Sequence, residues 1–588
     1  RLVVDKLYRY VHDKDFSSWK NNICIAADDG DEAIHAEQAD RGSDTLLLKN
    51  TSQPRLGFRV NKIYIDSYYM DPQTKKYPEA NRELMKQFNE GMLVFNYIGH
   101  NDSEVGFTGE GLFSRYEMDH LTNTRLPLFI TITCDYCQFD AEDVSAGENV
   151  FLNPSAGAIA LITTTRVVYT DGNDKINRRL MKRLLERDSN GSPLRIGDVL
   201  KLAKRDFNTE IDKNKLNYVL IGDPALKLAY PEHSIQVTRI NGNSGEKNIE
   251  MIPGKNYTVE GEIRSHQNEL LSDFNGYIYY NLYDKEKQFT TLAHQDKKTW
   301  TYTHRPDLLT TGKGTIQNGT FRITVTLPID NSHSGKSGLL NLYAYDESGR
   351  EANGYTDKLI VSTAVEPITE DIQGPDIEFA GINDDSFTEG ILVNNPATFV
   401  CKFSDPSGIW SGNSLGKQMT LSLDGACIEE DVARYYKPIA ESEIPEGEFI
   451  YPLPRLSNGL HTLTFKVFDT LGNSSEVTIA FEVKENSETY TISLEEEPAT
   501  ERATISCQDQ NGNDVTESKH TRISVTNTLG EEIWSYETTE NNLFPLTWNL
   551  QDNNGKRVSA GQYYCKGYFE TSAGTIVTPA KKIVVITQ

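Results

Sequence analysis

The sequence has no run that approaches the ~18 apolar residues needed for a membrane-spanning helix. It is also poor in positive charge, since 59 Lys and Arg face 85 Asp and Glu, which gives a net charge of -26. Nucleic acid and anionic membranes repel such an acidic surface, so neither is expected as the main partner. With 37% hydrophobic and 24% charged residues the composition is that of globular protein, and 588 residues predict three to five domains of ordinary size.

Cysteine is scarce as well. The seven cysteines are Cys24, Cys134, Cys137, Cys401, Cys427, Cys507 and Cys565. Their odd number leaves at least one free thiol. The spacing contains one Cys-x-x-Cys pair with no second pair and no clustered histidines, so we expect no structural zinc site. A structural calcium ion is left open.

The chain opens without a secretory leader. Its first 22 residues, "RLVVDKLYRYVHDKDFSSWKNN", are typical of the middle of a helical region. We therefore expect residue 1 to lie within a longer or processed protein, and the missing leader says nothing about the compartment.

Residues 1–232 alternate between strand-like and helical segments. Short apolar runs closed by turn residues predict buried strands at 21–29, 61–69, 93–100, 126–134 and 156–166, and the segment 217–231 closes the region. Apolar positions at helical spacing predict helices at 81–92, 175–189 and 195–208. This alternation predicts an α/β domain with a mostly parallel sheet that helices cover on both faces.

The remaining residues read as all-β. Alternating strands with tight turns at Gly349, Gly472 and Gly530 are typical of hairpins in Ig-like β-sandwich modules. Linker-like segments at 363–376 and 484–490 separate them. We place the modules at 233–365, 372–485 and 488–588.

Two reactive side chains end consecutive predicted strands. His100 follows "NYIG" and Cys134 follows "FITIT". Ligands of open α/β sheets bind outside the carboxyl ends of the strands, so these side chains are expected at one edge. There a thiolate could attack a carbonyl while the imidazole serves as base and acid. Backbone N–H groups of the turn at Gly99 and Asn101 could then stabilise the oxyanion.

Two other interpretations remain open on these residues alone. Cys134 could be a structural cysteine and His100 a surface histidine. Alternatively, "CDYC" at 134–137 could be a redox pair, although the acidic segment that follows raises a thiol pKa rather than lowering it.

Several motifs in order resemble the gingipain (C25) family of cysteine endopeptidases, clan CD relatives of caspases. "NYIGHNDSE" resembles the family's block around the catalytic histidine, which places His100 in that role. "RLPLFITITCDYCQFD" resembles the strand that ends in the nucleophile, and its Phe139-Asp140 pair selects Cys134 over Cys137. "GAIALITTTR" and "LIGDPALKL" resemble two further family strands.

The resemblance also implies supporting roles. "ICIAADDGDEAIHAEQAD" resembles the block with the acid that orients the histidine, so Asp29, or its neighbour Asp28, is implied for that role. The aromatic residue of the primary specificity pocket falls near Phe107. The family's glycine after the histidine is Asn101 here, with an extra Asp102, and no residue matches the acid that selects Arg or Lys.

The C-terminal module carries a second resemblance. A W-x-x-x-D-x-x-G-x-x-x-x-x-G-x-Y pattern runs through Trp548, Asp552, Gly555, Gly561 and Tyr563 and resembles the sorting domain of type IX secretion cargo. The combination implies a signal peptidase and sortase on the outer-membrane surface. Such an enzyme removes sorting domains from cargo and joins the cargo to anionic lipopolysaccharide, beside a PorV-type shuttle barrel and accessory subunits. A gingipain-like protease with ordinary substrates and a non-catalytic adhesin or scaffold remain the alternatives.

Overall fold

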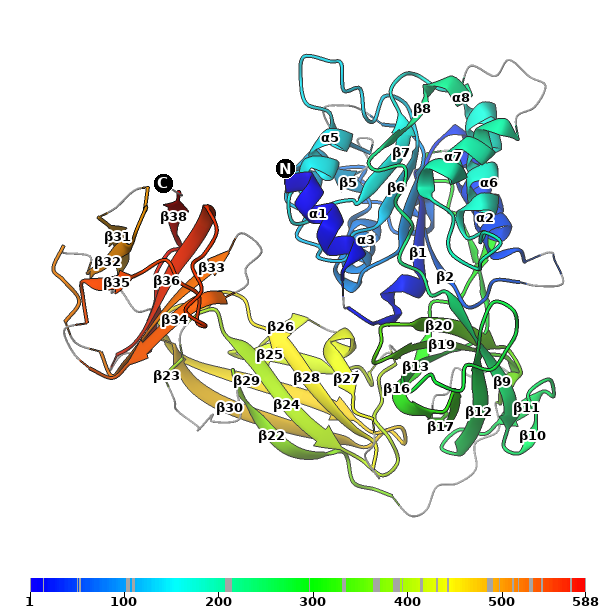
Figure 1. Cartoon of the computed structure of the whole chain (residues 1–588). Coiled ribbons are helices and arrows are strands. Elements are labelled where there is room, and N and C mark those ends of the chain that lie inside the picture. The colour runs from blue at the N-terminus through cyan, green and yellow to red at the C-terminus, as the bar shows by residue number, and fades with distance from the viewer. Residues whose placement is uncertain are drawn as a thin grey trace.

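The computed structural model describes residues 2–586 except 14, 50, 52–53, 102–105, 108–110, 207–213, 296, 330–334, 363–370, 384–391, 394, 413–415, 430–431, 441–443, 484–489, 496–497, 510–511, 517, 528–531, 541–542 and 572–573. The turn at Gly530, Asp102 and most of the two predicted linkers therefore lie outside the described residues. The rest forms an α/β module and three β modules that follow one another in an arc (Figure 1). Within the described residues, no helix is long and apolar enough to cross a membrane.

A six-stranded sheet forms the centre of the α/β module. Its order is β2-β1-β3-β6-β7-β8. The strands are β1 (Asn22–Ala27), β2 (Arg59–Tyr64), β3 (Val94–Ile98), β6 (Leu128–Ile132), β7 (Ala160–Thr164) and β8 (Tyr218–Ile221). All neighbouring strands are parallel except β7 and β8, which are antiparallel. The sheet is therefore mostly parallel, as the apolar runs predicted.

Helices cover both faces of this sheet. The α helices are α1 (Leu2–Val11), α2 (Ile34–Leu47), α3 (Pro78–Glu90), α4 (Arg115–Asp119), α5 (Ala146–Leu152), α6 (Thr170–Leu184), α7 (Ile196–Arg205) and α8 (Asn214–Asn217). Short 3-10 turns are η1 (Ser18–Asn21), η2 (Asp31–Ala33) and η3 (Ile65–Ser67), and a two-stranded hairpin joins β4 (Gly106–Phe107) to β5 (Phe113–Ser114). The fold class is thus the predicted α/β architecture.

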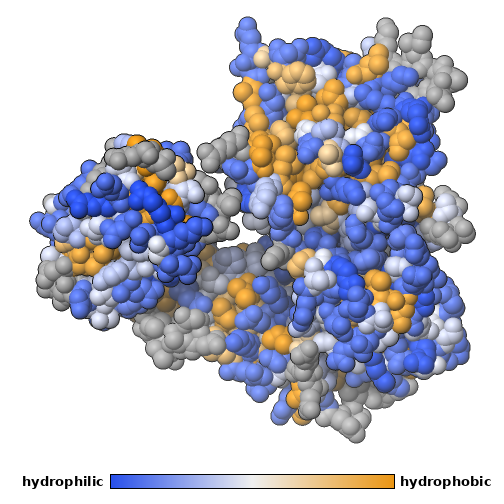
Figure 2. Space-filling model, viewed as in Figure 1, coloured by the Kyte–Doolittle hydropathy of each residue, from blue (hydrophilic) through white to orange (hydrophobic). Residues whose placement is uncertain are grey.

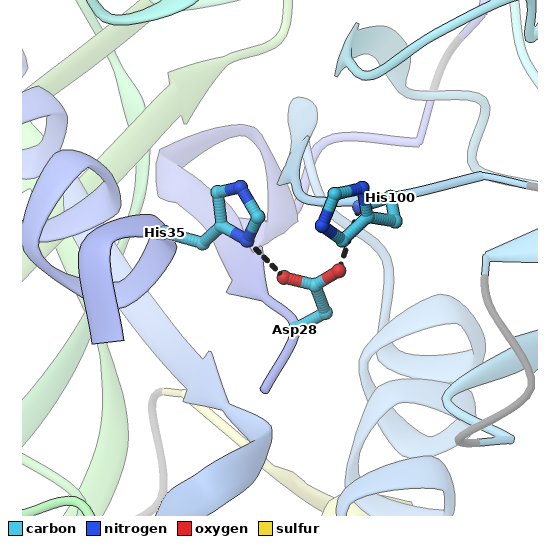
Figure 3. A group of neighbouring side chains, drawn as sticks. All are labelled: Asp28, His35 and His100. Carbon is cyan, nitrogen blue, oxygen red and sulfur yellow. Dashed lines mark hydrogen bonds and ion pairs between the residues drawn. The ribbon is translucent and has the colours of Figure 1, made fainter. Parts of the chain in front are cut away.

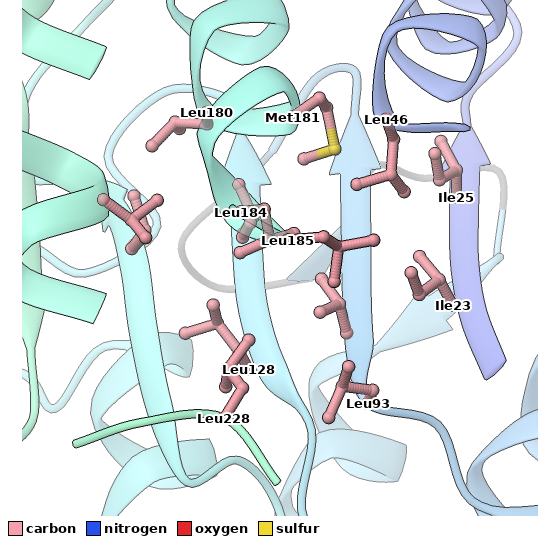
Figure 4. Close-up of a cluster of buried hydrophobic side chains, with 14 of the residues drawn as sticks. Ile23, Ile25, Leu46, Leu93, Leu128, Leu180, Met181, Leu184, Leu185 and Leu228 are labelled. Carbon is pink, nitrogen blue, oxygen red and sulfur yellow. The ribbon is translucent and has the colours of Figure 1, made fainter. Parts of the chain in front are cut away.

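The two faces of the sheet have separate apolar cores. Alternate residues of β1, β3 and β6 pack under α2, α6 and α7, and we call this the α2 face (Figure 4). The intervening residues pack under α3, α4 and α5, and we call this the α3 face. Since successive strand residues point to opposite faces, the parity of a residue decides which core it joins.

The three β modules have cores of their own. The first contains β9 (His233–Ile240), β10 (Asn243–Ser244), β11 (Ile249–Met251), β12 (Asn256–Arg264), β13 (Gly276–Tyr283), β14 (Lys287–Thr290), β15 (Thr301–His304), β16 (Leu308–Gln317), β17 (Thr320–Thr326), β18 (Lys336–Ser337), β19 (Leu339–Asp346), β20 (Glu351–Thr356) and β21 (Leu359–Val361). The second contains β22 (Asp376–Ile382), β23 (Leu392–Val393), β24 (Thr398–Ser404), β25 (Thr420–Leu423), β26 (Ala426–Glu429), η4 (Ala433–Tyr435), β27 (Tyr436–Pro438), β28 (Glu446–Pro452), β29 (Gly459–Phe468) and β30 (Ser474–Val483). The last contains β31 (Thr491–Leu494), β32 (Ala503–Gln508), β33 (His520–Asn527), β34 (Glu532–Thr538), β35 (Leu546–Trp548), β36 (Gly561–Thr571), β37 (Gly574–Val577) and β38 (Lys581–Val585).

The first β module is attached firmly to the α/β module. Its β14–β15 hairpin leaves the main sheet and adds Phe289, Trp300 and Tyr302 to the core of the α2 face. At the hairpin tip, the buried Asp66 carboxylate accepts the N–H groups of Ala293 and His294 at 2.7 and 3.0 Å. The hairpin thereby reaches the carboxyl end of β2, close to the edge where β1 ends.

The exposed apolar residues are unevenly distributed. Figure 2 shows most of them, in this view, on the α/β module, while the C-terminal module presents a largely hydrophilic surface. On α1, Val4, Tyr8 and Val11 are all more than half exposed.

Candidate active site

The chain order of the strands creates a crevice at the carboxyl edge of the sheet. From β1 the chain passes through α2 to β2 on one side, and then through α3 to β3 on the other side of β1. The helices α2 and α3 lie on opposite faces of the sheet. In open α/β sheets such a reversal of strand order marks the ligand site. Here the reversal falls between β1, which leads to Asp28, and β3, which leads to His100.

His100 and Cys134 occupy equivalent positions on neighbouring strands. β3 and β6 are parallel, and their register pairs Ile98 with Ile132. The Gly99 N–H donates to the Ile132 carbonyl at 3.3 Å, and the Asn101 Nδ2 donates to the Cys134 carbonyl at 3.2 Å. His100 follows Ile98 by two residues, and Cys134 follows Ile132 by two residues. The two predicted residues therefore lie side by side at the carboxyl edge of the sheet.

The two cysteines of the Cys-x-x-Cys pair lie on opposite faces of the sheet. Cys134 continues the alternation of Ile130 and Ile132 and packs partly buried against the core of the α2 face. Cys137 is fully buried in the core of the α3 face, where α5 covers it and burial raises the pKa of its thiol to about 11. The two sulfurs therefore occupy different environments, and neither forms a disulfide.

The Cys134 sulfur lies against the backbone of Val168, in the segment that leads into α6. The Val168 N–H and carbonyl both lie 3.5 Å from Sγ. An amide N–H at this position can stabilise a thiolate. Sequence reasoning did not identify Val168, because a backbone contact leaves no signal in the residue type.

The predicted orienting acids do not contact the imidazole of His100. Asp29 is buried and accepts a hydrogen bond from the Tyr77 hydroxyl. Asp28 accepts the backbone N–H of His100 at 2.6 Å and faces Nδ1 of His35 at 2.5 Å (Figure 3). The carboxylate beside the ring is that of Asp31, whose Oδ2 lies 3.3 Å from His100 Nε2. The structure thus places the orienting contact two residues beyond the predicted one.

Asp31 reaches His100 through an unusual backbone. Asp31, Glu32 and Ala33 have φ angles of 53°, 60° and 62°, in the left-handed region that non-glycine residues rarely adopt. Such conformations cost about 1–3 kcal/mol each and tend to gather at functional sites. No sequence rule predicts three of them in succession, which explains why Asp31 was missed.

Of the two predicted oxyanion donors, the structure leaves only Asn101 as a candidate. The Gly99 N–H is already used by Ile132, so it is not available to an oxyanion. Gly99 has a different role: a Cβ there would lie 2.4 Å from the Asp28 carboxyl carbon, so glycine permits the close approach of that carboxylate. Asn101 remains next to Cys134 and stays a candidate donor.

The prediction that Phe107 lines a specificity pocket is wrong for this structure. The ring is 1% exposed and stacks between Tyr97 and Tyr136, with centroid distances of 3.8 and 5.0 Å. It belongs to the core of the α3 face, because the β4–β5 hairpin folds it inward. A substrate side chain has no exposed face of this ring to contact.

Comparison with known proteins gives one family. Residues 1–229 match the profile described as Peptidase family C25. No curated protein matches the chain.

Among solved structures, dimeric latent PorU from Porphyromonas gingivalis is 18% identical with a TM-score of 0.31; the match covers 97% of this chain and 64% of that one. The complex of Porphyromonas gingivalis RgpB pro- and mature domains is 16% identical with a TM-score of 0.31, covering 61% of this chain and 73% of that one. Titin domains A168–A170 are 9% identical with a TM-score of 0.15, covering 60% of this chain and 99% of that one. The chain thus spans less than two thirds of the length of the PorU chain.

Proposed function

We propose that the protein is a cysteine endopeptidase with Cys134 as nucleophile and His100 as its acid and base, and the match of residues 1–229 to the profile of peptidase family C25 supports this. The observation that carries the proposal is the register of β3 and β6, which brings both side chains to one edge of the sheet. A thiolate and an imidazole at neighbouring strand ends supply the nucleophile and the proton carrier that peptide cleavage requires.

The proposed reaction has two stages. The Cys134 thiolate attacks the peptide carbonyl, and the carbon–nitrogen bond breaks as His100 protonates the leaving amine. This forms a thioester between the carbonyl carbon and Sγ. Water or a second amine then attacks the thioester, His100 accepts the proton of that nucleophile, and the thiolate is released. Asp31 beside His100 Nε2 would hold the ring in place during each transfer.

For the substrate we propose the C-terminal sorting domains of type IX secretion cargo, with transfer of the cargo to an amine on anionic lipopolysaccharide. The support is the sequence pattern of the last module. There Trp548 is buried and packs edge-on against Tyr563 at 5.7 Å, and Asp552 Oδ1 accepts the N–H groups of Asn554 and Lys556, each at 2.9 Å. The pattern residues therefore stabilise the turn between β35 and β36, where Gln551 and Arg557 form an isolated antiparallel bridge.

We extend the proposal to location and partners. The enzyme would act on the extracellular face of the outer membrane, beside a PorV-type shuttle barrel and accessory subunits. The last module would supply a docking surface for that barrel.

Processing of cargo tests this function. Cells that carry Cys134→Ala should accumulate uncleaved cargo, because the thioester cannot form, whereas Cys137→Ala should process cargo normally. Normal processing in Cys134→Ala would contradict the proposal. If the purified protein cleaves unrelated peptides at basic residues as fast as cargo, a general protease would be the better description. If cargo and such peptides both stay intact, the protein would be a non-catalytic scaffold.

A further inference from the structure

A second histidine, His35 on α2, lies beside His100. The two rings meet edge-to-face with centroids 5.0 Å apart, and Asp28 lies beneath both (Figure 3). One ligand atom from each of Asp28, His35 and His100 falls within 4.8 Å of the others. Nothing in the proposed peptidase reaction uses His35, although it is buried at the reactive edge.

Asp31 joins the two histidines. Its Oδ2 lies 3.3 Å from His100 Nε2 and 3.7 Å from His35 Nε2. In a tetrahedral zinc site with bonds of about 2.0–2.1 Å, adjacent ligand atoms stand about 3.4 Å apart. Each of the two distances from the Asp31 oxygen is therefore close to the spacing of two ligand atoms on one ion.

Asp28 contacts His35 at Nδ1, the ring nitrogen that does not face Asp31. It faces the Nδ1 of His35 at 2.5 Å, which turns Nε2 toward Asp31. Histidines that bind metals characteristically donate their other ring N–H to a carboxylate, which fixes the tautomer and strengthens the ligating nitrogen. Asp28 occupies that supporting position for His35 and also holds the backbone of His100.

The charge of the site favours a cation. Within the part of the chain that the structure describes, no lysine or arginine forms an ion pair with Asp28 or Asp31; their ion-pair partners are the two histidines. Lys298 of the first β module pairs with Glu32 instead. A divalent ion would supply the positive charge that two carboxylates and two imidazoles lack.

We propose that His35, His100 and Asp31 bind a divalent transition-metal ion, with Asp28 as the supporting carboxylate, and that this ion reversibly inhibits the peptidase. Two imidazole nitrogens and one carboxylate oxygen suit Zn²⁺, whereas Ca²⁺ and Mg²⁺ prefer oxygen ligands. Bound metal would hold His100 at Nε2 and oppose the positive charge that the ring must gain when it accepts a proton. Metal binding is independent of the proposed function, whereas inhibition rests on it.

Calorimetric titration with ZnCl₂ tests the site. The full chain carrying Cys134→Ala is used, so that the thiol cannot hold the metal. We expect one ion per chain, an affinity at least ~100-fold weaker when His35→Gln is added, and a loss of about 10–100-fold with Asp28→Asn. His120→Gln, which changes the exposed histidine that follows the last residue of α4, is the matched control and should leave the affinity unchanged.

Several outcomes would overturn the proposal. These are the absence of binding in Cys134→Ala, or an affinity that His35→Gln does not change. If His35→Gln fails to fold, as judged by circular dichroism, Asp31→Asn replaces it, since Asp31 is half exposed and its loss should weaken binding at least 10-fold.

A second readout separates this site from the proposed function. In the otherwise natural sequence, Zn²⁺ should reduce peptidase activity and EDTA should restore it. In His35→Gln the same zinc concentration should inhibit the peptidase less than it inhibits the natural sequence. If no peptidase activity is found at all, the titration still decides whether the metal site exists.

Discussion

The two faces of the central sheet differ sharply at its carboxyl edge. On the α2 face, the strand ends carry His100 and the partly exposed Cys134, with His35 above them. On the α3 face, the equivalent places hold Cys137, Tyr136 and Phe107, all at most 1% exposed. The segment after β6 thus supplies Cys134 to one face and Tyr136 and Cys137 to the other, because the chain leaves the strand and turns at Asp135, where φ is 48°.

The largest effect expected from this contrast concerns the two neighbouring cysteines. Cys134→Ala should lower kcat/KM more than ~10³-fold, since it removes the nucleophile. Cys137→Ala should keep kcat/KM per folded molecule and instead lower the free energy of unfolding by about 1–2 kcal/mol, because it leaves a small cavity. Steady-state kinetics and urea unfolding of both variants measure this. Equal losses of activity would favour a redox pair over a single nucleophile.

A substitution of Phe107 tests whether the α3 face serves packing and not substrate binding. Phe107→Ala should lower the free energy of unfolding by about 3–5 kcal/mol, as expected for a buried ring stacked between Tyr97 and Tyr136. The preference among substrates should stay unchanged at temperatures where the variant is folded. If Phe107→Ala changed the substrate preference and left the free energy of unfolding unchanged, Phe107 would line the substrate pocket after all.

The acids at the end of β1 provide a finer comparison. Asp31→Asn should lower kcat about 10–100-fold, because Asp31 lies beside His100 Nε2 and the ring loses that charged contact. Asp29→Asn should mainly reduce stability, by about 1–3 kcal/mol, because the buried Tyr77 hydroxyl loses a charged acceptor. If Asp29→Asn proves the more damaging to kcat, the predicted role of Asp29 would be restored.

The smallest effect lies far from the edge, in the second β module. The carboxyl group of Asp405 is buried near Asp469 and Asp371, and burial together with these like charges raises its pKa to about 6. The unfolded value is about 3.9, so the folded state binds the proton more tightly and loses stability as pH rises from about 4 to 6. Asp405→Asn should therefore stabilise the module by about 2 kcal/mol at pH 7.

Calorimetric melting at pH 4 and pH 7 measures this difference. The gain should be much smaller at pH 4, where Asp405 is protonated in the folded state and about half protonated in the unfolded state. The exposed Asp376 lies in the same module, so Asp376→Asn serves as the control and should melt like the natural sequence at both pH values. Destabilisation by Asp405→Asn at pH 7 would show that the charged form is the favoured one.

Much of the architecture was predictable because apolar runs mark buried parallel strands. The ends of those runs placed His100 and Cys134 at one edge, but counting residues from Ile132 does not work past the strand end, because Tyr136 and Cys137 both join the α3 face after the turn at Asp135. The sequence could not predict backbone conformations and backbone hydrogen bonds that no residue type marks. Asp31 reaches His100 only through three left-handed residues, Phe107 turns inward on a short hairpin, and the Gly99 amide is used by the sheet.

The most direct test is the order in which thiols react with limiting iodoacetamide at pH 7, followed by peptide mass mapping. Cys427 is exposed and serves as an internal reference, while Cys24 and Cys137 are buried. A thiolate stabilised by a neighbouring imidazole reacts faster than an ordinary thiol. Cys134 should therefore be alkylated before Cys427, and His100→Ala should remove that advantage. Labelling of Cys134 no faster than buried Cys24, or labelling of Cys137 first, would contradict a Cys134–His100 pair.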